Sequence, residues 1–202
     1  MKKKIFSKKL YSEMMKQQRM AALIFISICL VASVIRIVIE YTSWGNMKEI
    51  NPTGYATYAP FNDALAIAPI LFVFMYLGGL LLPFGAFSFL NKRSSSDFFH
   101  SIPYSRTCVF VSTVLATLTW VAITIFSTLL ATVLGCIFTG MTFYYSFLPP
   151  LIITLLIGTA MMCSIATLGM TITGTRFSNL IIFGLILFLP RFIMALSASG
   201  IL

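Results

Sequence analysis

The sequence predicts an all-α, polytopic membrane protein with about five transmembrane helices, an N-terminal interfacial helix and one short cytoplasmic helix. Of the 202 residues, 59% are hydrophobic and only 9% are charged, whereas about 25% of the residues of a soluble domain are charged. The mean hydropathy is +0.98. A membrane-spanning helix requires roughly 20 residues, and several uncharged stretches of the sequence reach that length. These properties exclude a water-soluble fold.

The first 19 residues are expected to form a cytoplasmic amphipathic helix, called here the elbow. Phe6, Leu10 and Met14 recur at four-residue spacing, so they share one face of a helix, and the basic residues lie largely off that face. This pattern is typical of a helix that lies in the membrane interface, with membrane lipids as its partner and its bases toward anionic head groups. The alternative is an ordinary basic tail that only sets the orientation of the chain.

The rest of the chain, residues 20–202, is predicted to be one transmembrane domain. Its spans are expected at about 20–41, 64–90, 107–138, 147–173 and 179–199. The long uncharged stretch between Arg106 and Arg176 is sufficient for two spans joined by a turn at Gly140. The first span follows a long polar segment, so it differs from the apolar region of a cleaved signal peptide.

The positions of the basic residues predict a cytoplasmic N-terminus. The net charge of +9 could indicate nucleic-acid binding, but no basic stretch alternates with aromatic residues, so we expect no nucleic-acid partner. With the N-terminus inside, the cytoplasmic loops contain Lys92, Arg93, Arg106 and Arg176, and Lys48 is the one basic residue in the segments placed outside. A further seven basic residues precede the first span: Lys2, Lys3, Lys4, Lys8, Lys9, Lys16 and Arg19. We therefore expect a multi-pass plasma-membrane protein.

The chain ends at residues 197–202 without a polar tail, directly after an apolar stretch. We therefore expect the transmembrane domain to be incomplete at its C-terminal end. Either the sequence is a fragment of a longer protein, or it is a truncated gene product.

Three charged residues lie within the predicted spans. Arg36 and Glu40 are one turn apart near the outer end of the first span, where they are expected to pair and extend toward the interface. Arg191 falls near the middle of the fifth span, where an arginine costs about 2.5–3.5 kcal/mol on the insertion scale. Either the helix breaks at Pro190 and Arg191 reaches a wet cavity or a head group, or a missing downstream part covers it.

Small and hydroxyl residues share one face of the third span and one face of the fourth. They are Thr113, Thr117, Thr124 and Thr128 in the third, and Ala160, Ser164, Thr167 and Thr171 in the fourth. Small residues allow membrane helices to approach closely, so we expect these faces to pack. A path for a substrate is the alternative.

No catalytic, cofactor or metal site is expected. His100 is the only histidine and lies in a predicted loop, which excludes a multi-histidine metal site and an intramembrane Ser–His pair. The four cysteines form no C-x-x-C pair and are interpreted as small core residues. No glycine is followed by lysine, so the phosphate-binding loop of an ATPase is missing. We expect no enzyme activity, and any ATP-driven work requires a separate subunit.

The loop between the second and third spans is the most informative segment. Ser94 followed by Asp97 is close to a capping box, and Pro103 ends the short helix that begins there. Its large apolar residues are Phe98, Phe99 and Ile102. Either they rest on the membrane surface, or they fill a pocket of a partner protein.

The segment consists of a basic pair, then Ser-Ser-Ser-Asp-Phe-Phe-His-Ser-Ile-Pro-Tyr-Ser-Arg, followed by a long apolar helix. In this order it resembles the corresponding segment of permease subunits of the ABC-2 type exporter family, in particular a group common in Gram-positive bacteria. The resemblance covers five spans in order and orientation. It implies an elbow over residues 6–15 and a coupling helix over residues 95–102 that docks on an ATPase subunit. The implied docking residues are Ser95, Ser96, Asp97, Phe98, Phe99, His100 and Ile102. The family's sixth span, and the extracellular region that often precedes it, are missing.

The expected function is therefore that of the membrane-spanning permease of an ATP-driven exporter of hydrophobic or amphiphilic compounds. The expected partners are an ABC ATPase subunit and a second copy or paralogue of the permease. ATP would be bound by the partner, with no cofactor on this chain. The alternative is a non-transporting membrane scaffold or regulator, such as a truncated or degenerate permease. An intramembrane enzyme has the least support.

Overall fold

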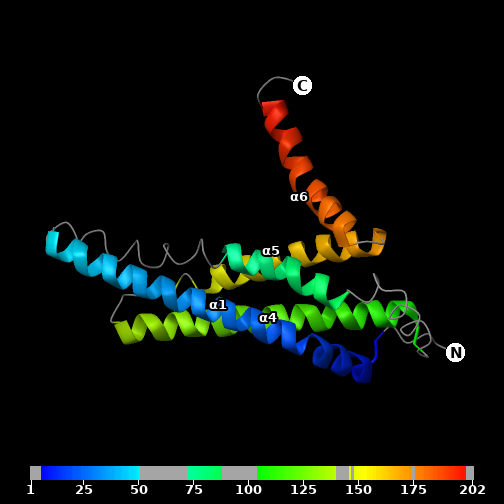
Figure 1. The fold of residues 1–202 in the computed structure, drawn as a ribbon, viewed down its shortest axis with the longest axis horizontal. Coiled ribbons are helices and arrows are strands. Elements are labelled where there is room, and N and C mark those ends of the chain that lie inside the picture. The colour runs from blue at the N-terminus through cyan, green and yellow to red at the C-terminus, as the bar shows by residue number, and fades with distance from the viewer. Residues whose placement is uncertain are drawn as a thin grey trace. The chain divides into compact units, whose positions relative to one another are not determined.

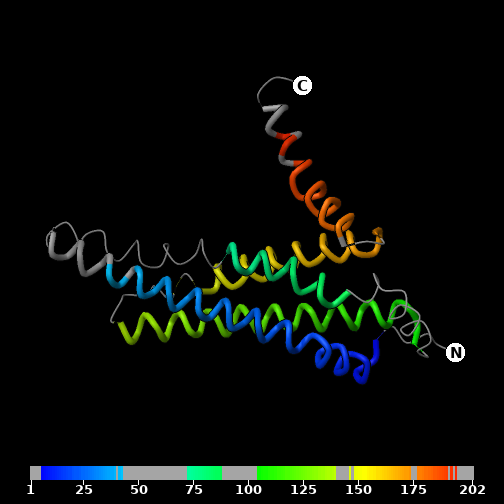
Figure 2. The backbone as a smooth tube through the Cα atoms, in the orientation of Figure 1, coloured from blue at the N-terminus to red at the C-terminus, as the bar shows by residue number. Residues whose placement is uncertain are grey.

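The computed structural model describes residues 6–50, 72–87, 104–139, 146, 148–173 and 176–198. Over these ranges the chain is helical and contains no strand (Figures 1 and 2). The helices are α1 (Lys8–Ile50), a helix over Phe72–Ala86, α4 (Arg106–Thr139), α5 (Leu148–Ile172) and α6 (Arg176–Ala198). For the described residues the predicted all-α class is confirmed.

Three of these helices, α1, α4 and α5, are long and apolar enough to cross a membrane. The helix Phe72–Ala86 and the apolar stretch Phe177–Pro190 of α6 are shorter. The helices therefore agree with the predicted class, and the number of five spans stays a prediction.

The elbow and the first predicted span form one uninterrupted helix in α1. It has 43 residues, about 65 Å at 1.5 Å per residue, which is roughly twice the 30 Å thickness of the hydrocarbon layer of a bilayer. No proline lies within it, and its first glycine is Gly45, so nothing at the expected junction near residue 19 ends the helix. α1 also continues past Thr42, where the sequence pattern predicts the first outside segment.

The bounds of α4 and α5 lie within one residue of the third and fourth predicted spans. The hydroxyl oxygen of Ser105 accepts a hydrogen bond from the backbone N–H of Cys108 at 3.3 Å, which caps the first turn of α4. Pro149 and Pro150 occupy the first turn of α5, where a missing N–H costs no helical hydrogen bond. The local signals for both helix starts therefore lie in the sequence.

The described chain divides into two compact units. The first contains Met1–Gln18, Gly79–Leu118 and Ala160–Leu202, and the second contains Arg19–Gly78 and Thr119–Thr159. The first unit therefore contains the beginnings of α1 and α4, the ends of α5 and of the helix Phe72–Ala86, and all of α6. Apart from the later part of α6, these are the helix ends that the basic residues assign to the cytoplasmic side.

In the second unit, glycines make room for large side chains of neighbouring helices. A Cβ atom on Gly78 would meet the ring of Phe25 of α1, and one on Gly135 of α4 would meet Ile37 of α1. A Cβ atom on Gly158 of α5 would meet the ring of Tyr76. Each glycine therefore allows a close helix–helix contact, as small residues do in membrane proteins.

The threonines of α4 lie inside the protein. Thr113, Thr117, Thr124, Thr128 and Thr132 are fully buried, and each donates its hydroxyl hydrogen to the carbonyl four residues earlier. The packing interpretation of this stripe is confirmed. On the corresponding face of α5, by contrast, Thr167 is buried while Ser164 and Thr171 are exposed.

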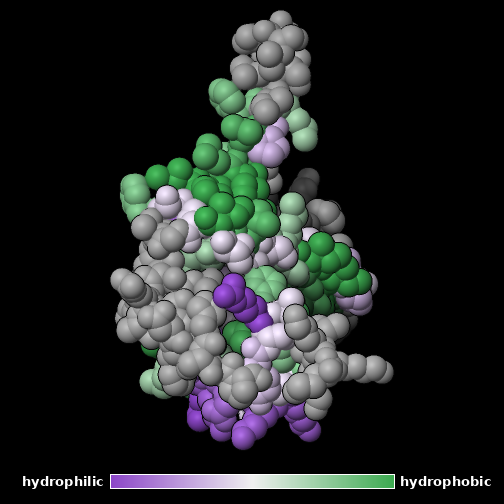
Figure 3. All heavy atoms as spheres, turned by 90° about the vertical axis from the view of Figure 1, so that its right-hand side faces the viewer, coloured by the Kyte–Doolittle hydropathy of each residue, from purple (hydrophilic) through white to green (hydrophobic). Residues whose placement is uncertain are grey.

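Large apolar side chains are exposed along the helices. They include Ile24, Ile28, Val31, Ile35 and Val38 of α1, Ile153, Ile157 and Met161 of α5, and Leu180, Leu185 and Phe188 of α6. In Figure 3, hydrophobic atoms cover much of the coloured surface above the centre of the view, and hydrophilic ones lie near its centre and at its lower edge. Apolar surface of this extent indicates contact with a membrane or with other protein.

Candidate functional site

The residues that the resemblance assigns to ATPase docking, Ser95, Ser96, Asp97, Phe98, Phe99, His100 and Ile102, lie outside the described residues. What the structure does describe is both flanks of this segment. Phe87 follows the helix Phe72–Ala86, and Tyr104 and Ser105 precede α4. The described part of the candidate site therefore consists of the helix ends on either side of this segment.

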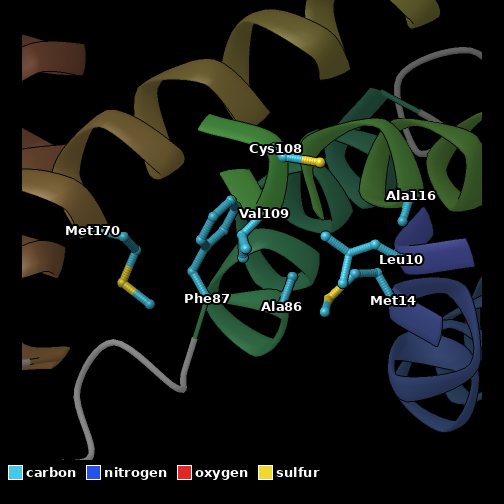
Figure 4. Packing of buried hydrophobic residues seen from close by; sticks show 8 residues of the cluster. All are labelled: Leu10, Met14, Ala86, Phe87, Cys108, Val109, Ala116 and Met170. Atoms are coloured by element: carbon cyan, nitrogen blue, oxygen red, sulfur yellow. The ribbon is translucent and has the colours of Figure 1, made fainter. Parts of the chain in front are cut away.

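The helix ends nearest this segment contribute to one cluster of buried side chains in the first unit, called here the anchor cluster. Its members are Leu10 and Met14 of α1, Ala86 and Phe87, Cys108, Val109 and Ala116 of α4, and Met170 of α5. Figure 4 shows Phe87 and Val109 next to one another, with Leu10 and Met14 close to Ala116. The ring of Phe87 also lies against that of Phe110, with centroids 5.6 Å apart. Phe87 before the segment, and Cys108 and Val109 after it, thus belong to one buried cluster.

The elbow residues divide between this cluster and the surface. Leu10 and Met14 are 6% and 4% exposed and contact protein, which corrects the prediction that they face lipid. Phe6 is 44% exposed, with its ring 6.0 Å from that of Tyr11. Four-residue spacing of apolar residues produces a helix face that suits lipid or another helix equally well, so the pattern alone did not distinguish the two.

A polar contact continues the buried face of α1 one turn beyond Met14. Gln18 is 6% exposed, and its Oε1 lies 3.2 Å from Oγ1 of Thr117 on α4. The same Thr117 Oγ1 lies 2.9 Å from the carbonyl oxygen of Thr113. Gln18 Nε2 has no hydrogen-bond partner among the described residues. The sequence analysis missed Gln18, although its position in phase with Leu10 and Met14 is a usable signal.

A second buried polar side chain lies where α5 and α6 meet. Asn179 is fully buried, and neither its Oδ1 nor its Nδ2 has a partner within the described part of the chain. A Cβ atom on Gly169 of α5 would meet Asn179 Oδ1. On α6, Phe183 is the other buried residue among those whose side chains are described, so the first two turns of α6 make its packing contacts.

The charged residues of the predicted spans are only partly described. Arg36 lies on α1 and is partly buried, while the side chains of Glu40 and Arg191 lie outside the described residues. The Arg36–Glu40 pair therefore stays a prediction. α6 continues as a helix through Pro190, which contradicts the helix break offered as one explanation of Arg191. Membrane helices tolerate such a proline when other groups satisfy the freed carbonyl.

The described residues contain no group of three or more His, Cys, Asp or Glu side chains that could hold a metal ion. Cys29, Cys108, Cys136 and Cys163 are all free and buried, which agrees with their interpretation as small core residues. Cys108 belongs to the anchor cluster.

The fold and the site define a class rather than a family. Over its described residues, the protein is all-helical with three helices that could cross a membrane, which is compatible with a membrane protein. A buried cluster joins the flanks of one loop to the N-terminal helix. Comparison of the chain with protein-family models, with curated proteins and with solved structures finds no match.

Proposed function

We propose that this protein is the membrane-spanning permease component of an ATP-driven exporter and that it works with a separate ATPase subunit. The observation that supports the proposal best is the anchor cluster. It joins both flanks of the segment expected to dock on the ATPase, through Phe87 and Val109, to Leu10 and Met14 of α1. A segment held in this way can pass a displacement to the helices, because packed side chains move together.

The proposed mechanism follows from this packing. ATP binding draws two ATPase subunits together, and residues 95–102 move with them, with Phe98 and Phe99 seated in a pocket of the ATPase. The movement reaches α4 through Val109 and α1 through Leu10 and Met14. Displacement of these helices, in a pair of permease copies or paralogues, opens a path for a hydrophobic or amphiphilic compound.

The plasma membrane is the proposed location, with the N-terminus in the cytoplasm. The exposed apolar residues of α1, α5 and α6 support contact with lipid. The first unit contains the basic start of α1, the start of α4 at Arg106 and all of α6, which starts at Arg176. Under the positive-inside rule, these ends belong on the cytoplasmic side, where an ATPase would bind.

Co-purification with the ATPase tests the proposal. The Phe98→Ala, Phe99→Ala double variant of the full chain is expected to lose most of the ATPase that co-purifies with the unsubstituted chain, because two aromatic anchors at an interface centre are each worth about 2 kcal/mol. Membrane expression should be unchanged. The matched control is the Phe126→Ala, Phe138→Ala double variant, which removes two exposed phenylalanines of α4 and should bind normally.

The same experiment identifies the alternative function. Undiminished co-purification of the Phe98→Ala, Phe99→Ala variant would overturn the docking assignment. A complete lack of ATPase binding by the unsubstituted chain would favour the non-transporting scaffold or regulator.

A further inference from the structure

In the contact between Gln18 and Thr117, the number of hydrogens does not match the number of acceptors. The hydroxyl of Thr117 has one hydrogen but two acceptors within reach, Gln18 Oε1 at 3.2 Å and the carbonyl oxygen of Thr113 at 2.9 Å. The amide nitrogen of Gln18 has two hydrogens and, among the described residues, no acceptor. One donor is therefore shared and another is unused, in an environment where unused donors are costly.

Turning the Gln18 amide by 180° gives each of the two contacts a hydrogen of its own. Nε2 then donates to Thr117 Oγ1, and the hydroxyl hydrogen of Thr117 goes to the carbonyl oxygen of Thr113. The oxygen and nitrogen of such an amide are assigned from their hydrogen bonds, and a hydroxyl oxygen both donates and accepts. In this arrangement Gln18 Oε1 and the second hydrogen of Nε2 have no partner among the described residues.

The position of this contact relates it to the anchor cluster. Gln18 is one turn beyond Met14 on α1, and Thr117 follows Ala116 on α4. Met14 and Ala116 are both members of the cluster. The apolar members resist displacement through close packing, which is not directional. The hydrogen bond adds a defined pair of atoms and is lost when they separate by more than about 3.5 Å, so a shift of α1 by one residue, about 1.5 Å along its axis, would break it.

We propose that Gln18 and Thr117 are positioning residues: the Gln18 amide donates to Thr117 Oγ1, holds the first turns of α1 in register with α4, and makes α1 follow a displacement of Phe87 and Val109. The first role, holding α1 in register with α4, does not depend on any partner protein. The second role, making α1 follow a displacement, rests on the proposed exporter function.

The first test uses the native Cys108, which is buried in the anchor cluster, as a reporter in membranes that contain the full chain. Its labelling by N-ethylmaleimide, located by mass spectrometry, should accelerate about three- to tenfold in Gln18→Met and in Thr117→Val, since interhelical hydrogen bonds in membranes are modest in strength. The double variant should exceed neither single variant, and Thr117→Ser should restore slow labelling. Cys136, in the second unit, should label at its original rate in all of them.

A matched control is Thr128→Val. This substitution removes a buried α4 hydroxyl that donates to Thr124 within the same helix, and it should leave Cys108 labelling unchanged. Unchanged Cys108 labelling in Gln18→Met, or additive acceleration in the double variant, would overturn the register-holding bond. Faster labelling of Cys108 and Cys136 together would also overturn it, because it would indicate general loosening.

The second test measures basal ATP hydrolysis by the full chain reconstituted with its ATPase. Gln18→Met and Thr117→Val should lower kcat about threefold or more with KM for ATP unchanged, because the nucleotide site is on the other subunit, and Thr117→Ser should restore kcat. Normal kcat together with fast Cys108 labelling would overturn the coupling role and leave the register role. If the unsubstituted chain recruits no ATPase, the exporter function and the coupling role fail together, and the labelling test still decides the bond.

Discussion

At the scale of single residues, the exposed fraction of a side chain distinguishes apolar residues that pack inside the protein from those that lie on its surface. The elbow stripe illustrates this, because Leu10 and Met14 are buried whereas Phe6 is exposed. The glycines differ in the same way. A Cβ atom on Gly78 meets the buried ring of Phe25, while one on Gly85, in the same helix, meets nothing within 4 Å.

Gly78 and Gly85 of the helix Phe72–Ala86 therefore predict opposite effects of a Gly→Ala substitution. Gly78→Ala should lower the free energy of unfolding by about 1–3 kcal/mol, because the added methyl group overpacks the contact with Phe25. Gly85→Ala should leave stability unchanged or raise it by up to about 1 kcal/mol, through helix propensity. Thermal unfolding of the purified variants in detergent compares them. Equal loss of stability in both would contradict the close α1 contact at Gly78.

The buried elbow residues predict a packing role for the N-terminal segment. Leu10→Ala should lower the free energy of unfolding by about 2–5 kcal/mol, as expected for a buried leucine. Met20→Ala, which truncates a largely exposed side chain of the same helix, serves as the control and should cost much less. The measurement is detergent unfolding of the full chain. If Leu10→Ala proved as mild as Met20→Ala, the interfacial interpretation of the elbow would be restored.

At the scale of helices, the sequence predicts those whose ends have local signals. Ser105 and the pair Pro149 and Pro150 define the starts of α4 and α5, and the predicted bounds agree with the structure. The sequence analysis expected an elbow separate from the first span, whereas the structure has one continuous helix, α1. Between residues 8 and 44 there is neither proline nor glycine, and a change from amphipathic to apolar composition does not by itself end a helix.

The contact between α5 and α6 gives a prediction at this scale. Asn179→Leu replaces a buried amide, without partners among the described residues, by an apolar side chain of similar size. Stability should rise by about 1 kcal/mol, because the desolvation cost of the amide disappears. Gly169→Ala should instead destabilise, since the methyl group meets position 179. Heat denaturation followed by circular dichroism provides the measurement, and a clear loss of stability in Asn179→Leu would show that the amide has a partner.

At the scale of the whole molecule, composition and charge predict a helical membrane protein, and the helices agree with that class. For the candidate site, the loop sequence predicts docking residues over 95–102, and this stays a prediction because they lie outside the described residues. The anchor cluster was not predicted, and it combines residues as distant along the chain as Leu10, Phe87, Val109 and Met170. No local pattern relates them, because their proximity depends on how the helices pack.

The orientation of the chain can be checked directly. Single cysteines introduced as Ser94→Cys and Gly54→Cys, in a cysteine-free background, are exposed to a membrane-impermeant maleimide added to intact cells. Only position 54 should react, because the basic residues place the 91–106 loop inside. Labelling at position 94 with protection at position 54 would invert the topology and exclude cytoplasmic docking of an ATPase.

The continuity of α1 has a functional consequence. α1 continues without a break from Gln18, the last of its residues in the first unit, to Arg19, where the second unit begins. Backbone hydrogen bonds join each turn of a helix to the next, so the residues that pack around Leu10 and Met14 and the exposed apolar residues such as Ile24 and Ile28 belong to one helix. In the proposed exporter, docking of the ATPase and contact with lipid would therefore involve the same helix.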